Sequence, residues 1–349
     1  DNGYQQDPAA EPILGEYLAE NFMFAAFKLT IGAEVGEIHP VVLKFDSTEA
    51  CVPLRLTRIA AVEDMEVRTF FMSSHRIVPK NYKHVLVNPL KLDWPNFGQN
   101  YKDVITMAVD AGGADGKAFV TEYAGPNNVQ TFNLWSGTWD AGPFPTLDPI
   151  AVIDTLRDQN VLYCEDVSGG GGTGYCEFYH GLMEGLLDQF LPAPDSVPKY
   201  AFWGCLSCYE GLIDPMIWDG DAFATAYQER IIEPGAHAVD IVNTWPYLTR
   251  MYTTISPGEM TEDPFFHANP DLQDVGAARI ATQRNLCNRD QVYILPDGRE
   301  VYLPAGQSWP EFPDEMPWEE DIETMLPSGS PENLVDNTAL IDQLLAEYN

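Results

Sequence analysis

Asn21–Ser74 contains four apolar runs, which are Phe22-Met-Phe-Ala-Ala-Phe-Lys-Leu, Val41-Val-Leu-Lys-Phe, Cys51-Val-Pro-Leu-Arg-Leu-Thr-Arg-Ile and Val67-Arg-Thr-Phe-Phe-Met. Polar or Gly/Pro-containing breaks separate the runs, and each run has the length of a strand. Leu54-Arg-Leu-Thr alternates with a period of two, and the last run is rich in β-branched and aromatic residues. The stretch therefore predicts an antiparallel sheet with one buried face.

The composition describes a globular and strongly acidic chain. Its 349 residues are 45% hydrophobic, which is enough for one large or two medium cores. There is no run of about 18 apolar residues, so we expect no transmembrane segment. The 19 basic and 53 acidic residues give a formal net charge of −34, which repels phosphate backbones, so nucleic acid is not expected as a partner. The acidity favours either solubility in a salty medium or divalent cation binding by some carboxylates.

The fold class predicted for the whole chain is α+β, in three parts. Residues 1–145 read as a β-rich domain, with a short strand at Val85-Leu-Val and a hairpin of Val104–Asp110 with Ala118–Tyr123. Residues 146–290 read as mainly helical. Residues 291–349 read as a hairpin, an acidic extended segment and a terminal helix.

The helices of the middle part are predicted from caps and apolar spacing. Asp148-Pro149 caps the first, and the second runs from Phe178 to Phe190. Two more are expected over 221–232 and 236–248. In the last part, Asp297-Gly298 marks the hairpin turn, and Ser330 begins a final helix whose leucines need a surface to pack on.

Six cysteines suggest disulfides, with free thiols or a zinc site as alternatives. Cys164 and Cys176 flank a Gly-rich loop that a disulfide could close, and Cys205-Leu-Ser-Cys208 is a C-x-x-C motif. Zinc sites usually have two tight cysteine pairs, and only one pair here is tight. A thioredoxin-like role is disfavoured because no βαβ pattern surrounds the motif. The remaining two, Cys51 and Cys287, stand alone in the sequence.

One set of residues has the spacing of a transition-metal site. Glu177, His180, Glu184 and Asp188 are three or four residues apart, which would place them on one side of a helix. Glu-x-x-His is half of a di-metal motif, but the second copy is missing. A solvated polar helix face is the alternative interpretation.

Two loop segments offer the hard oxygen ligands that Ca²⁺ prefers. Asp110 and Asp115 bracket a Gly-rich turn. Four more residues crowd a second segment, and they are Asp263, Asn269, Asp271 and Asp274. Neither segment matches an EF-hand loop, and Asx turns or helix caps would explain the same residues.

The sequence contains no local catalytic signature. There is no Gly-x-Ser-x-Gly and no His-Glu-x-x-His, and Gly169–Gly174 lacks the Lys of a phosphate loop. A Ser/His/Asp triad leaves no local trace because its members lie far apart along the chain. Five histidines are isolated in sequence and are expected to be structural, namely His39, His75, His84, His237 and His267.

Four strings together resemble the bacterial family catalogued as domain of unknown function 2330. They are Cys51-Val-Pro-Leu-Arg-Leu-Thr, Asn81-Tyr-Lys-His-Val-Leu-Val-Asn, Ala118-Phe-Val-Thr-Glu-Tyr-Ala-Gly and Tyr247-Leu-Thr-Arg-Met-Tyr-Thr-Thr-Ile-Ser-Pro-Gly-Glu-Met-Thr-Glu-Asp-Pro. The resemblance covers about residues 1–290. It implies an exported or envelope protein, often myxobacterial, in which an N-terminal Cys-containing half precedes Asp1. The family has no assigned activity, so it implies no catalytic residues, but an exported location favours disulfides.

Taken together, the sequence predicts an exported surface or extracellular protein without catalytic activity. We expect it to bind a partner, its own N-terminal half or further copies of itself, and Ca²⁺ is its candidate cofactor. The alternative is a secreted hydrolase or metal-dependent enzyme whose active site comes from distant residues, for example around Glu177 and His180.

Overall fold

A computed structural model of the chain describes residues 8, 10–22, 49–169, 173–214 and 217–349. The predicted strand at Val41–Phe45 and all but the first residue of Phe22–Leu29 lie outside these residues, as does His39. Contacts divide the chain into a sheet unit, Asp1–Pro126 with Tyr247–Asn349, and a helical unit, Asn127–Pro246. The units meet after Pro126 and before Tyr247, whereas the boundaries predicted from the sequence follow residues 145 and 290.

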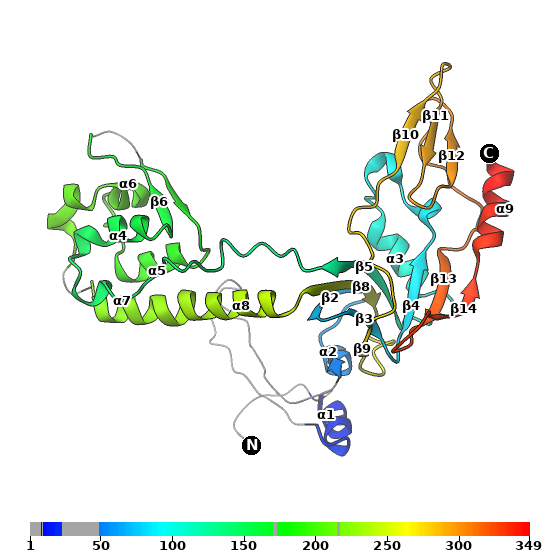
Figure 1. Ribbon diagram of the computed structural model, residues 1–349, viewed down its shortest axis with the longest axis horizontal. Helices are drawn as coiled ribbons and strands as arrows, with labels where there is room; N and C mark the ends of the chain where they lie inside the picture. The colour runs from blue at the N-terminus through cyan, green and yellow to red at the C-terminus, as the bar shows by residue number, and fades with distance from the viewer. Residues whose placement is uncertain (1–7, 9, 23–48, 170–172, 215–216) are drawn as a thin grey trace. The chain divides into compact units, whose positions relative to one another are not determined.

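A mixed six-stranded sheet forms the centre of the sheet unit (Figure 1). Its strands, in spatial order, are β14 (Glu332–Asp336), β13 (Glu319–Thr324), β4 (Lys83–Val87), β5 (Ala118–Pro126), β8 (Tyr247–Ile255) and β2 (Met65–Ser73). All neighbours are antiparallel except β4 and β5, which are parallel. The predicted strands at Val67–Met72, Val85–Val87 and Ala118–Tyr123 are confirmed, and so is the α+β class.

The predicted strand at Val104–Asp110 is wrong, because this segment forms helix α3 (Tyr101–Val109). Parallel strands such as β4 and β5 require a crossover connection, and α3 supplies it. The helix buries Val104, Ile105, Ala108 and Val109, the last three of which pack with Val85, Val120 and Ile322 of the sheet. Spacings of three and four place these side chains on one helix face. An apolar run of this length fits a strand equally well, so only the tertiary packing decides.

Leu54–Thr57 was also predicted as a strand but forms the short helix α2. Asp263 accepts a hydrogen bond from the Arg55 backbone N–H at 2.8 Å, and the Thr57 hydroxyl donates to the Pro53 carbonyl. These contacts satisfy backbone groups that a sheet ladder would otherwise use.

Two three-stranded sheets complete the β structure of the sheet unit. The first is ordered β1 (Ala50–Cys51), β9 (Phe265–Asn269) and β3 (Arg76–Pro79), and the second β10 (Thr282–Asn285), β11 (Gln291–Ile294) and β12 (Glu300–Leu303). Gly298 has φ of +91° between β11 and β12, which confirms the predicted Asp297-Gly298 turn. Helix α1 (Ala10–Ala19) buries Ile13 and Tyr17.

The C-terminal segment differs from its prediction. Instead of lying extended on the surface, residues 305–329 bury Trp309, Phe312 and Met316 and contribute β13 to the sheet. The segment that begins at Glu332 is β14, and the terminal helix α9 starts only at Thr338 and ends at Tyr348.

Helix α9 already has a docking surface within its own chain. Ile341 and Leu345 are buried in one apolar cluster with Tyr293 of the hairpin and with Trp309. The surface that the leucines of this helix were expected to need is thus supplied in part by the same chain.

The helical unit packs around aromatic side chains. Its elements are α4 (Val152–Asp158), β6 (Leu162–Cys164), β7 (Cys176–Phe178), α5 (Met183–Phe190), α6 (Lys199–Gly204), α7 (Gly220–Tyr227) and α8 (Glu233–Thr244). Phe202, Trp203, Phe223 and Tyr227 are each at most 1% exposed. A π-helical turn, Gln228–Ile232, joins α7 directly to α8.

Two predicted helices of this unit have different ends in the structure. The helix expected from Phe178 begins at Met183, because Cys176–Phe178 pairs with β6. The helix expected to reach Leu248 ends at Thr244, since β8 begins at Tyr247. The Asp148 cap is confirmed, with its carboxylate accepting from the Ile150 N–H at 3.1 Å.

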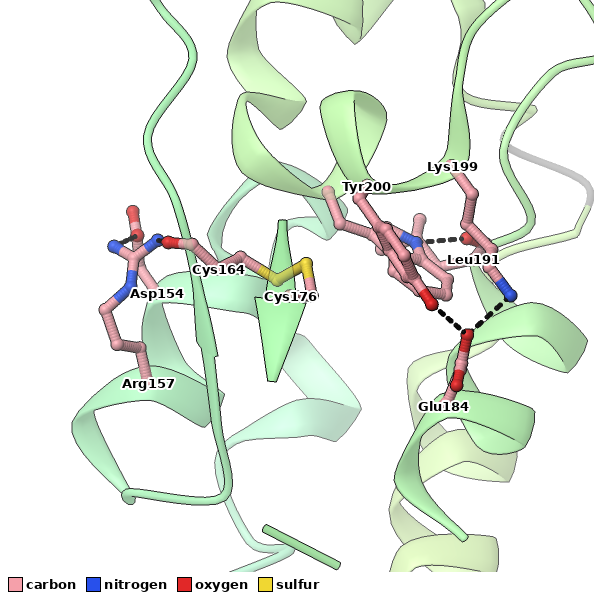
Figure 2. The surroundings of a disulfide bond; sticks show 9 residues. Asp154, Arg157, Cys164, Cys176, Glu184, Leu191, Lys199 and Tyr200 are labelled. Carbon is pink, nitrogen blue, oxygen red and sulfur yellow. Dashed lines mark hydrogen bonds and ion pairs between the residues drawn. A yellow bond between two sulfur atoms is a disulfide. The ribbon is translucent and has the colours of Figure 1, made fainter. Parts of the chain in front are cut away.

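Four of the six cysteines form disulfides, and both bonds lie in the helical unit. Cys164 pairs with Cys176 between β6 and β7, and Figure 2 shows Arg157 donating to the Cys164 carbonyl beside this bond. Cys205 pairs with Cys208. Cys51 and Cys287 are free thiols. Among the described helices, none is both long and apolar enough to cross a lipid bilayer.

Candidate functional site

The residues proposed as transition-metal ligands are not on one helix. Glu177 belongs to β7, His180 lies in the turn before α5, and Glu184 and Asp188 are on α5. Figure 2 shows Glu184 bound by Tyr200 and Lys199, and its Oε1 lies 2.9 Å from the Tyr200 hydroxyl. The His180 ring packs edge-on against Trp139, and burial lowers its pKa. These contacts make Glu184 part of a structural ion pair.

The residues proposed for Ca²⁺ are engaged in local contacts. Asp263 is buried and bound to Arg55, while Asn269 donates to the carbonyls of Leu326 and Gly329. Asp271 accepts from the Gly329 N–H, and Asp274 accepts from the Tyr247 hydroxyl. These are loop-fixing roles of Asx side chains.

Asp110 and Asp115 flank the turn after α3. Asp110 follows the last residue of the helix, and Asp115 has φ of +53°, a conformation that Asp tolerates. In the part of the chain that the structure describes, no three His, Cys, Asp or Glu side chains are grouped so that they could hold a metal ion.

The structure brings together a different set of residues on three neighbouring strands. His84 of β4 lies opposite Glu323 of β13 in register, and Thr121 comes from β5 on the other side of β4. Val85, Ile322 and Val120 point toward α3. Successive strand residues point to opposite faces, so the three polar side chains share the face away from α3.

These three side chains form a continuous chain of hydrogen bonds. His84 Nδ1 lies 2.9 Å from Glu323 Oε2, and His84 Nε2 lies 2.9 Å from Thr121 Oγ1. His84 is 1% exposed, Thr121 4% and Glu323 8%. Strand β5 carries one extra residue opposite β8 between Thr121 and Tyr123, and such bulges commonly re-aim side chains beside functional sites.

Burial fixes the protonation of His84. Desolvation lowers its pKa below the ordinary value, an effect that Arg76 adds to and the hydrogen bond from His84 to Glu323 opposes. The neutral imidazole therefore donates from Nδ1 to the Glu323 carboxylate and accepts at Nε2. The Thr121 hydroxyl is left to donate its hydrogen to Nε2.

Arg76 of β3 is hydrogen-bonded to the Thr121 end of this chain. It is 8% exposed, and it donates from Nη2 to Thr121 Oγ1 at 3.2 Å and from Nη1 to the Gln273 carbonyl at 3.1 Å. Its buried Nε has no hydrogen-bond partner. Desolvation lowers the pKa of Arg76, as burial of an incompletely compensated cation does.

A pocket of about 220 Å³ opens onto these side chains. Its apolar walls include Leu86, Leu92 and Trp94, and its charged lining residues include Arg76, Arg279, Asp297 and Glu320. Arg299 binds both of these carboxylates at 2.7 Å. Among the described residues, neither Arg76 nor Arg279 forms an ion pair, and Arg279 donates only to the Thr121 carbonyl. The pocket lining thus contains two cations and two carboxylates, and among the described residues only the carboxylates are held in ion pairs.

This arrangement is suited to holding an oxyanion. Guanidinium groups bind carboxylate or phosphate oxygens through paired N–H donors, and a buried cation outside any direct ion pair gains most from such a ligand. The site was not predicted because His84 lies far along the chain from its partners Thr121 and Glu323. The only signal was a polar residue, His84, within the apolar run of a buried strand.

Comparison with known proteins gives a family match and little else. No curated protein and no solved structure matches the chain. A family model matches residues 1–133, a segment that contains Arg76, His84 and Thr121 but ends before Arg279 and Glu323. The string from Tyr247 to Pro264 also lies outside this segment. Over residues 1–133 the chain matches the family model described as an uncharacterized protein conserved in bacteria (DUF2330).

Proposed function

We propose that this protein is an exported binding protein whose Arg76 pocket takes the oxyanion group of a small ligand. One observation carries the proposal. Arg76 is buried with an unpartnered Nε and no carboxylate within ion-pair distance among the described residues, whereas both carboxylates of the pocket are already held by Arg299, which also pairs with Asp342. A buried unpaired charge lowers stability, and a bound anion would compensate it.

The size of the pocket limits the ligand. About 220 Å³ is below the usual range of roughly 300–1,000 Å³ for drug-sized ligands. A small organic acid or a phosphate-bearing group fits this volume, with its apolar part against Leu86 and Trp94. Carboxylate and phosphate share the chemistry that the two arginines recognise, so the binding experiment must separate them.

Titration calorimetry with succinate, butyrate and inorganic phosphate tests the proposal. We expect the wild-type protein to bind succinate or phosphate, and Arg76→Met to weaken binding by about 10- to 100-fold, since hydrogen bonds to charged groups contribute about 1.5–3 kcal/mol. Arg284→Met is the matched control, because Arg284 is exposed and pairs with Glu300 away from the pocket. Equal affinities in all three proteins, or no binding of any anion, would refute the proposal.

Export is supported by the two disulfides, which form and persist in oxidising compartments. Thiol alkylation in intact producing cells, followed by peptide mass spectrometry, tests this part. We expect Cys51 and Cys287 to be alkylated and the other four cysteines to be recovered as disulfides. Alkylation of Cys164, Cys176, Cys205 and Cys208 as well would place the native protein in a reducing compartment.

A further inference from the structure

The hydrogen bonds around Thr121 all run in one direction. Arg76 has only donors, so Thr121 Oγ1 accepts from it and donates its own hydrogen to His84 Nε2. The ionised Glu323 has only acceptors, so His84 Nδ1 donates to it. The order is cation, hydroxyl, imidazole and carboxylate, which is the arrangement of an activated nucleophile with its base and orienting group.

A purely structural network would explain the hydrogen-bond distances among Arg76, Thr121 and His84. It would not require the residue that carries the hydroxyl, Thr121, to line a pocket. Thr121 and His84 both line the pocket, so a ligand held by the arginines lies against the hydroxyl. Arg76 Nη2 is 3.2 Å from Thr121 Oγ1. If this hydroxyl attacks a carbonyl carbon, the carbonyl oxygen gains negative charge close to the same guanidinium, which can stabilise it. The hydroxyl thus has a base on one side and an anion-stabilising donor on the other.

We propose that Thr121 is the nucleophile of an esterase site that cleaves small esters carrying a free carboxylate. This inference rests on the proposed anion binding for its choice of substrate. Arg279, with Arg76, holds the free carboxylate, and the ester carbonyl lies over Thr121. Glu323 is a positioning residue, since it acts through His84.

The reaction balances with water as the only co-reactant. Thr121 Oγ1 attacks the carbonyl carbon while its proton passes to His84 Nε2. The tetrahedral intermediate collapses, the bond to the leaving alcohol breaks, and His84 returns the proton to that alcohol. Water then attacks the acyl-threonine with His84 again as base, which releases the acid and restores the hydroxyl.

The test uses the full chain and two chromogenic substrates, the mono-4-nitrophenyl ester of succinic acid and the uncharged 4-nitrophenyl butyrate. We expect the succinate ester to be cleaved with a burst, and Thr121 to gain the mass of one succinyl group on rapid quenching. Thr121→Val should reduce kcat by about 10²-fold or more, whereas Thr121→Ser, which keeps the hydroxyl, should retain turnover. Acylation of Thr121 in the wild-type protein tests the proposal even if Thr121→Val fails to fold.

Glu323→Gln gives a readout that a purely structural role would not move. Glu323 raises the pKa of His84, and burial and Arg76 lower it. Loss of the carboxylate should therefore shift the acidic limb of the kcat/KM profile to lower pH as well as reduce the rate. An unchanged profile would contradict the positioning role.

The outcomes separate this inference from the binding proposal. Succinate binding without acylation at Thr121 overturns the esterase site and leaves the binding function intact. Turnover that persists unchanged in Thr121→Val also overturns it. Equal turnover of the two esters, with acylation at Thr121, supports the nucleophile but contradicts recognition of the anion.

Discussion

The two units of the chain bury different kinds of side chain. Among the described residues, fourteen polar or charged side chains are buried, and only Gln159 lies in the helical unit. The helical unit instead has an aromatic core and both disulfides. Buried polar groups oppose folding unless they are fully paired, whereas apolar packing and cross-links favour it. The contrast supports the proposal that the binding site lies in the sheet unit, while the helical unit is stabilised by apolar packing and cross-links.

The largest expected effect tests the apolar core. Phe223 is fully buried, and its ring lies 4.9 Å from that of Phe144 and 5.8 Å from that of Phe190. Phe223→Ala should reduce the free energy of unfolding of the helical unit by about 3–5 kcal/mol. Hydrogen exchange with mass spectrometry should show faster exchange in α5 and α7 and unchanged protection of β4 and β5.

The control for this change is Phe132→Ala in the same unit, because Phe132 is 75% exposed. It should alter stability by less than about 0.5 kcal/mol. Uniform loss of protection in both units after Phe223→Ala would show that they unfold together, and the contrast between them would then have no energetic meaning.

The disulfides provide the second test. Cys164 and Cys176 are 12 residues apart in sequence, so loop-closure entropy predicts a loss of about 3 kcal/mol on replacing both by Ala. Cys205 and Cys208 are only three apart, and the matched double replacement should cost about 2 kcal/mol. Urea denaturation of both variants measures the difference. A greater loss from the second pair would point to native-state contacts of Cys205 rather than to chain entropy.

Local pattern predicted much of the fold but not the site. Strand β2 and the hairpin around Asp297-Gly298 follow from residues close in sequence, and the structure confirms both. Helix α3 was missed because its apolar run suits a strand as well. His84 and Glu323 are 239 residues apart and meet only because β13 pairs with β4. Single-sequence reasoning has no access to such a pairing, so the site could only emerge from the folded chain.

A smaller effect distinguishes a functional charge from a structural one. Arg76→Met removes a buried cation and keeps a side chain of similar length, so the ligand-free sheet unit should gain about 1–2 kcal/mol. The two hydrogen bonds from Arg76 to Thr121 and Gln273 are lost, which limits the gain. Thermal unfolding at neutral pH gives the measurement.

Saturating succinate or phosphate should reverse that order. At 100 times its Kd the wild type gains about 2.7 kcal/mol of binding free energy, whereas Arg76→Met, with its weaker affinity, gains less. A variant that is less stable than wild type without any ligand would indicate that Arg76 supports the fold, and the sheet unit would then resemble the helical unit in its use of side chains.

The smallest effect concerns a carboxyl group at the end of α3. Burial, together with the charges of Glu259 and Asp64, raises the pKa of Asp110 to about 6. The folded-state pKa lies above the ordinary 3.8, so folding favours the protonated form. The stability from this group is therefore complete below about pH 4 and is lost as the pH rises through about 6.

Asp110→Asn should accordingly stabilise the sheet unit at pH 7.5 by up to about 1 kcal/mol, a value reduced for solvent screening of this exposed side chain. Most of the gain should disappear at pH 4, where folded Asp110 is protonated and the unfolded carboxyl, with its ordinary pKa of 3.8, is about half protonated. Melting temperatures across this range measure it. A gain at pH 4 equal to that at pH 7.5 would assign the effect to the helix end rather than to charge.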